Sequence, residues 1–166
     1  MDKYYYLISQ LPELKFGGEV SVSRNEFLKQ ALEWLSENDF ALLEKVDVND
    51  FSLNDDDCSV IKKYKDFERN LREEIAKHRN ALKKKEEYEL REPLKSILTE
   101  GNPLDVEKKL LYLRWRFIEE LQLFHYFDIG FLILYLLKIQ ILSRLAVFDK
   151  EKGRAVFDEL SRPALM

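Results

Sequence analysis

The amino-acid sequence predicts an all-α protein, a bundle of about six or seven helices joined by short connections. Apolar residues recur every three or four positions along most of the chain, which is the spacing of helices that bury one face. Glycine (5) and proline (4) are scarce among the 166 residues, so few tight turns are expected. Residues 4–11 alone have a strand-like composition, and no second clear strand is present to pair with them.

The N-terminal elements are short. The segment 4–11 (YYYLISQL) can form a short strand or a helical turn, because its three tyrosines favour a strand. A turn at KFGGE is followed by a capping box, SRNE, in which the hydroxyl of Ser23 accepts a hydrogen bond and Glu26 reaches back to the cap. We therefore expect one helix over about 23–36 and a second, shorter helix over 39–46.

An acidic loop, DVNDFSLNDDDC, begins at Asp47, and its clustered aspartates suggest calcium. An EF-hand loop requires a glycine at its sixth position and a glutamate at its twelfth. Counted from Asp47, these positions hold Ser52 and Cys58, so the pattern fails. We expect a solvated loop that also caps the next helix through Asp57 or Ser59.

The longest predicted helix covers about 60–88 and has a narrow apolar seam of the coiled-coil type. Between Lys62 and Lys85 it carries 10 basic and 4 acidic residues, and a basic stripe is what neutralising phosphates requires. However, Glu68 and two further glutamates interrupt the stripe, and no exposed aromatic platform accompanies it. We therefore favour a solvated helix or one that contacts protein over a nucleic-acid site.

The C-terminal half is expected to contain four helices, over about 93–100, 102–127, 129–148 and 155–160. Pro93 suits the first position of a helix, and Asp128 suits the N-cap of the hydrophobic helix that follows it. The nine residues from Ile129 to Leu137 contain nothing charged, but the run ends at Lys138, whereas a bilayer span needs about 20 apolar residues. This sequence predicts a central core helix and no membrane span, with most side chains from 131 to 142 buried.

Length and charge limit how the chain can be divided into domains. The 166 residues can form one all-helical domain (1–166) or two lobes, an acidic N-terminal lobe (1–58) and a helical bundle (59–166). Residues 1–58 carry 5 basic and 13 acidic side chains, a net −8, and residues 59–166 carry 22 and 18, a net +4. This asymmetry suits two differently charged partners or an ordinary solvated surface. A single cysteine and the lack of a signal-peptide pattern indicate a cytoplasmic protein, either complete or a fragment of a longer one.

The sequence contains no catalytic constellation, phosphate-binding loop or dinucleotide fingerprint that we recognise. The two histidines, His78 and His125, form no metal-ligand spacing with Cys58. We therefore expect a non-enzyme with no catalytic residue, cofactor, metal or small-molecule substrate.

Partner contact is the function that the remaining residues favour. Arginine and tryptophan are enriched at binding hot spots, and the segment LRWRF places Trp115 between two arginines. Alternatively, Trp115 is a core residue with the arginines on its flanks. The candidate partner-binding residues are Arg114, Trp115, Arg116, His125, Lys83, Lys84 and Lys85.

Two blocks of the chain resemble a small uncharacterised bacterial family encoded in operons for V-type (A/V-type) ATPases. One block is YYYLISQLPELKF followed by SRNEFL, and the other is LRWRFIEELQLFHYFDIGFLILYLLKIQILSRLAVFDKEKG. Part of the second block, FLILYLLKIQILSRL, is also similar to helices of the C subunit of these ATPases, called d in eukaryotes. That protein is funnel-shaped and all-helical, is about twice as long as this chain, and couples the central stalk to the proteolipid ring.

The resemblance implies a non-catalytic component or assembly factor of a V-type ATPase, similar to its C subunit, which acts through protein–protein contacts in proton or sodium transport coupling. Its partners would be V-type ATPase subunits on the central stalk or membrane ring side. Its place would be the cytoplasm, or the inner face of the membrane through the ATPase complex. The alternative is a stand-alone helical adaptor that binds nucleic acid through the basic helix 62–85.

Overall fold

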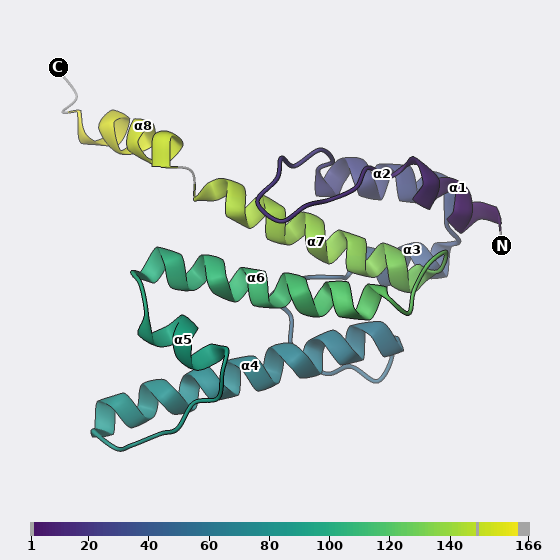
Figure 1. The fold of residues 1–166 in the computed structure, drawn as a ribbon. Coiled ribbons are helices and arrows are strands. Elements are labelled where there is room, and N and C mark those ends of the chain that lie inside the picture. The colour runs from purple at the N-terminus through teal and green to yellow at the C-terminus, as the bar shows by residue number, and fades with distance from the viewer. Residues whose placement is uncertain (1, 149, 163–166) are drawn as a thin grey trace.

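The computed structural model describes residues 2–148 and 150–162, and these form eight α-helices without a strand (Figure 1). The all-α fold class is confirmed. The helices are α1 (Asp2–Gln10), α2 (Arg24–Trp34), α3 (Glu37–Glu44), α4 (Ser59–Lys84), α5 (Leu94–Thr99), α6 (Pro103–Gln122), α7 (Ile129–Val147) and α8 (Lys150–Ser161). The expected number of six or seven helices is therefore too low among the described residues.

The additional helix is α1, where a short strand had been the alternative. Tyr4, Leu7, Ile8 and Leu11 recur at helical spacing and belong to the apolar core or pack against it, and Leu7 is fully buried. The hydroxyl of Tyr4 also donates a hydrogen bond to Asp39 of α3. Burial of one helical face thus outweighs the strand preference of the tyrosines.

Side-chain caps begin several helices, as the sequence predicted. The Ser23 hydroxyl accepts from the amide of Glu26 at 3.2 Å, and the Glu26 carboxylate accepts from the amide of Ser23 at 3.0 Å, which confirms the capping box. Asp128 caps α7 by accepting from the amide of Phe131 at 2.9 Å. The short helix α3 begins earlier than expected because Ser36 caps it.

The predicted ends of α4 and α6 and the predicted extent of α8 are also wrong. The long helix α4 ends at Lys84 and not near 88, because Lys85 takes a left-handed conformation (φ 56°) and its amide bonds back to the carbonyls of Ala81 and Leu82. The chain then folds back, which allows Leu90 to be buried. In addition, α6 ends at Gln122 instead of about 127, and α8 is longer than the predicted 155–160.

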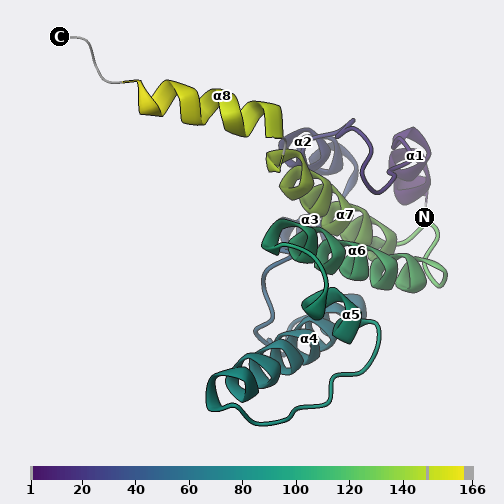
Figure 2. The same ribbon diagram turned by 60° about the vertical axis from the view of Figure 1, so that its left-hand side comes forward.

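The hydrophobic helix α7 lies at the centre of the bundle and packs against α2, α3, α4 and α6 (Figures 1 and 2). All side chains from 132 to 139 are buried, as are Ile141 and Leu142, which confirms the predicted core helix. Among the described residues, α7 is also the one helix long and apolar enough to cross a membrane. Because 61% of its most apolar window is buried inside the fold, α7 behaves as a core helix.

The buried apolar side chains form two clusters. The larger cluster surrounds α7 and contains residues on both sides of position 58, from Leu7 to Leu142. The smaller cluster joins the second half of α4 to α5 and the start of α6, and it consists of Leu71, Ile75, Leu90, Leu94, Ile97 and Leu110. Figure 2 shows α4 and α5 on one side of the α6–α7 pair, and α8 extending away from the other helices.

Candidate functional site

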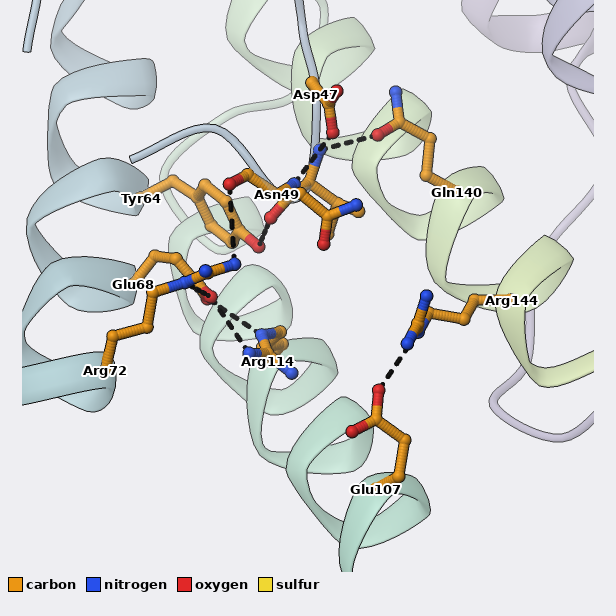
Figure 3. A network of polar contacts seen from close by, with 10 residues as sticks. Asp47, Asn49, Tyr64, Glu68, Arg72, Glu107, Arg114, Gln140 and Arg144 are labelled. Atoms are coloured by element: carbon orange, nitrogen blue, oxygen red, sulfur yellow. Dashed lines mark hydrogen bonds and ion pairs between the residues drawn. The ribbon is translucent and has the colours of Figure 1, made fainter. Parts of the chain in front are cut away.

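Glu68 is the most deeply buried charged residue of the described chain, with no exposed surface. Its carboxylate accepts two hydrogen bonds from Arg114 of α6, at 2.8 and 2.9 Å, and one from Nε of Arg72 at 2.8 Å (Figure 3). Burial alone would raise the pKa of Glu68, but the hydrogen bonds and positive charges of Arg114 and Arg72 outweigh it and hold the pKa below its ordinary value. Glu68 is therefore a carboxylate that fixes α6 to α4.

The loop between α3 and α4 is tied to the same region (Figure 3). The hydroxyl of Tyr64 donates to the carbonyl of Val48 at 2.9 Å. Gln140 of α7 accepts from the amide of Val48 at 2.6 Å and donates to the carbonyl of Val46 at 2.8 Å. These bonds satisfy backbone groups that are partly buried away from water, so the loop has a defined path between α4 and α7.

The acidic part of this loop is organised around a lysine. The ammonium of Lys65, a residue only 5% exposed, lies 2.7 Å from a carboxylate oxygen of Asp57 and 3.3 Å from one of Asp50. Although burial opposes it, hydrogen bonding to the two aspartates raises the pKa of Lys65. The predicted cap through Asp57 or Ser59 is wrong: the N-cap of α4 is Cys58, without a side-chain bond, because Asp57 is engaged with Lys65.

A groove of about 500 Å³ opens beside Glu68, between α4, α6 and the last turns of α7. Ile75, Leu110 and Leu111 contribute buried apolar side chains to it. The charged side chains that line it are five cations and one anion, namely Arg72, Arg79, Lys83, Arg114, Arg144 and Glu107. This basic groove combines an apolar floor with cationic walls.

The other end of the bundle carries a surface of a different kind, the aromatic end surface. It is formed by α1, the end of α2 and the turn between α6 and α7, which meet on the right of Figure 1. The ring centroids of Tyr5 and Phe127 are 5.0 Å apart, and those of Tyr6 and Trp34 are 5.8 Å apart in a stacked pair. Its members are 37% to 78% exposed and comprise Tyr5, Tyr6, Trp34, Leu123, Phe124, Tyr126 and Phe127.

A polar clasp holds the turn that presents four of these side chains. Nδ1 of His125 lies 2.7 Å from a carboxylate oxygen of Asp128, whose second oxygen caps α7. The imidazole rests on the first turn of α7 at Gly130, where an added Cβ would lie 2.5 Å from Nδ1. Residue 130 must therefore lack a side chain for the turn to keep this shape.

The structure does not bring the sequence-predicted partner-binding residues together into one site. Arg114 and Lys83 both line the basic groove, and Arg114 is also bonded to Glu68. His125 lies at the base of the aromatic turn, whereas Arg116, Lys84 and Lys85 are exposed and line neither surface.

Trp115 is in the core, at 2% exposure, as the alternative interpretation of LRWRF proposed. Its indole N–H donates to Glu119 at 2.9 Å, and the ammonium of Lys138 lies 4.8 Å from its ring centroid. Burial lowers the pKa of Lys138, against the opposing effect of Glu119.

Sequence reasoning missed most of the groove and most of the aromatic end surface. Glu68 follows Tyr64 by four residues and precedes Leu71 by three, so its position in the apolar seam was a signal of burial. The exposure of the aromatic rings had a weaker signal in the sequence: the run LFHYF follows the last residue that fits the helical spacing of apolar side chains. Among the described residues, no group of three histidine, cysteine, aspartate or glutamate side chains is placed to hold a metal ion.

Residues 52–162 match the model of a family described as a protein of unknown function (DUF2764), and the chain belongs to this family. No curated protein and no solved structure matches the chain.

Proposed function

We propose that this protein is a non-catalytic component or assembly factor of a V-type ATPase, similar to the C subunit of that enzyme, and that it acts through protein–protein contacts. The observation that carries the proposal is the aromatic end surface. Phe124, Tyr126 and Leu123 are 67% to 78% exposed, and Phe127 of the same turn contacts Tyr5 of α1. Contiguous exposed apolar side chains of this kind mark interaction sites, and tyrosine and tryptophan are enriched at the residues that dominate binding.

The choice of partner is supported by where the two resembling blocks lie. The first block, YYYLISQLPELKF, contributes Tyr5 and Tyr6, and the second contributes the turn from Leu123 to Phe127. Although more than a hundred residues separate them in the sequence, the rings of Tyr5 and Phe127 are in contact. Parts of both blocks that resemble the family of V-type ATPase operons therefore contribute to one surface, which we assign to the ATPase partner on the stalk or ring side.

The alternative, a nucleic-acid adaptor that uses helix 62–85, has less support. Several of its basic side chains are paired with carboxylates: Lys65 with Asp57, Arg72 with Glu68, and Arg69 with Asp66. Lys77 also lies 3.9 Å from Glu74. These pairs reduce the positive charge that the helix can offer to a phosphate backbone.

The proposal is tested by retention of purified ATPase stalk, peripheral and ring subunits on the immobilised protein. We expect the wild type to retain at least one of them. The double substitution Phe124→Ser/Tyr126→Ser is expected to weaken that retention by roughly tenfold or more, as loss of hot-spot side chains does.

Leu53→Ser/Leu82→Ser is the matched control, because Leu53 and Leu82 are also exposed (56% and 64%) but belong to the loop before α4 and to α4, which do not form the aromatic end surface. The control is expected to behave as the wild type. Failure of the wild type to retain any of the ATPase subunits would overturn the proposed function, and equal losses in both variants would overturn the assignment of the surface.

A further inference from the structure

We propose that the basic groove is a second binding site, which takes an acidic amphipathic helix of a partner protein. The groove carries positive charge that is free to pair with a ligand. Arg79 and Lys83 are exposed and have no ion-pair partner among the described residues. Nε of Arg144 donates a hydrogen bond to Glu107 at 3.0 Å, so the two terminal nitrogens of the guanidinium remain available to a ligand.

Two further cations of the groove are held in place by hydrogen bonds. The side chain of Arg114 is 13% exposed and is held by two bonds to Glu68. Arg72 is held by the same carboxylate and by the carbonyl of Asn49 at 3.4 Å. Cations fixed in advance lose little side-chain entropy when they bind an anion.

The spacing of the cations indicates the chemistry of the ligand. Arg72, Ala76, Arg79 and Lys83 are spaced by four, three and four residues, so they follow one face of α4. A helix whose glutamates or aspartates recur at the same spacing can pair with this row, and its apolar residues can cover Ile75 and Leu110 on the floor. Charge complementarity and the apolar floor together define an acidic, amphipathic partner.

A polypeptide fits the groove better than a nucleic acid does. The residues that line the groove include no aromatic side chain on which a base could stack. Glu107, whose side chain is 34% exposed, also adds a negative charge to the wall of the groove. This charge would repel a continuous phosphate backbone, whereas the carboxylates of a helix are spaced apart and can avoid it.

The test is fluorescence anisotropy with the full chain and a labelled, amidated helical peptide of glutamate and leucine at low salt. We expect binding that weakens as salt is added. A peptide with glutamine in place of glutamate, and the variant Arg79→Glu/Lys83→Glu, are each expected to lower the affinity by roughly tenfold or more.

The matched control is Lys77→Glu/Lys84→Glu, which reverses two charges on another face of α4 and should change the affinity less than about twofold. The proposal is overturned if the acidic peptide does not bind, if the glutamine peptide binds equally well, or if both double variants lose affinity alike. It is also overturned if single-stranded oligothymidylate binds more tightly than the peptide and loses affinity in Arg79→Glu/Lys83→Glu, because the groove would then be a nucleic-acid site. These probes contain no part of the ATPase, so the outcome is independent of the proposed function.

Discussion

The contact between α4 and α6, called the seam below, buries a charged side chain, whereas the aromatic end surface exposes apolar ones. In the seam, Glu68, Arg72 and Arg114 satisfy one another with hydrogen bonds of 2.8 to 2.9 Å, and Glu68 is fully buried. At the aromatic end, Phe124 is 78% and Tyr126 69% exposed. The difference indicates that the seam contributes to folding and that the aromatic end is available for binding. Substitutions should therefore change stability in the first region and partner affinity in the second.

The largest effect is expected for Glu68→Gln. The variant leaves the mostly buried guanidinium of Arg114, 13% exposed, without its negative partner, which typically costs about 3–5 kcal/mol. It also removes the partner of Arg72, whose side chain is 39% exposed and therefore adds less. Urea denaturation followed by circular dichroism measures the free energy of unfolding. Glu107→Gln is the control, because its pair with Arg144 is exposed and should contribute no more than about 1 kcal/mol. Equal losses of unfolding free energy in the two variants would show that the buried ion pairs between α4 and α6 contribute no more to stability than an exposed pair does.

The same carboxylate predicts a dependence of stability on pH. Because the pKa of Glu68 is lower in the folded protein than its ordinary value of 4.5, Glu68 stabilises the fold fully above pH 4.5. This contribution is lost as the pH falls below 4.5 through the folded-state pKa. Glu26 and Asp50 also have lowered pKa values, so the readout is the difference between wild type and Glu68→Gln. The difference in unfolding free energy between the wild type and Glu68→Gln should become smaller below pH 4.5. A difference that stays constant would contradict a lowered pKa of Glu68 in the folded protein.

A smaller loss of stability is expected for Gly130→Ala, a substitution that should change both stability and partner affinity. The added Cβ would lie 2.5 Å from Nδ1 of His125, so the imidazole must move and the clasp to Asp128 must open. Overpacking of this kind costs about 1–3 kcal/mol, and the displaced turn should also weaken partner retention.

Gly153→Ala is the control for that substitution, because an added Cβ at this position in α8 meets no atom within 4 Å. Alanine in a helix should leave stability unchanged or raise it by up to about 1 kcal/mol. Urea denaturation of both variants checks the prediction. A Gly130→Ala protein as stable as the wild type would show that the clasp does not hold the turn.

The smallest effect on stability is expected for Phe124→Ser/Tyr126→Ser. Because both side chains are mostly exposed, their replacement should change the free energy of unfolding by no more than about 0.5 kcal/mol each. Urea denaturation measures this value. Destabilisation as large as that of Glu68→Gln would mean that the rings are part of the fold, and a loss of partner retention could then not be assigned to binding.

Local rules predicted much of the fold because they act over a few residues. The capping box of Ser23 and Glu26 and the cap at Asp128 form as expected, since each depends on a hydroxyl or carboxylate next to free helical amides. The burial of α7 was also predictable, because leucine and isoleucine occupy all its faces and only a central helix can bury them.

The groove and the aromatic end surface could not be predicted in the same way because each joins segments distant in sequence. Glu68 and Arg114 are 46 residues apart, and Gln140 meets Val48 across 92. A pattern in one helix shows that Glu68 interrupts a seam, but it does not show which arginine satisfies it. The end of α4 was missed for a related reason: Lys85 adopts a left-handed turn without glycine, and the burial of Leu90 accompanies that turn.

Contact between the aromatic end surface and the ATPase, as proposed above, can be measured by amide hydrogen exchange of this protein with and without intact V-type ATPase. We expect binding to slow exchange in residues 4–10 and 121–131 and to leave α5 (Leu94–Thr99) unchanged. Exchange that is the same with and without the ATPase, or that slows only outside these two segments, would contradict the proposed contact.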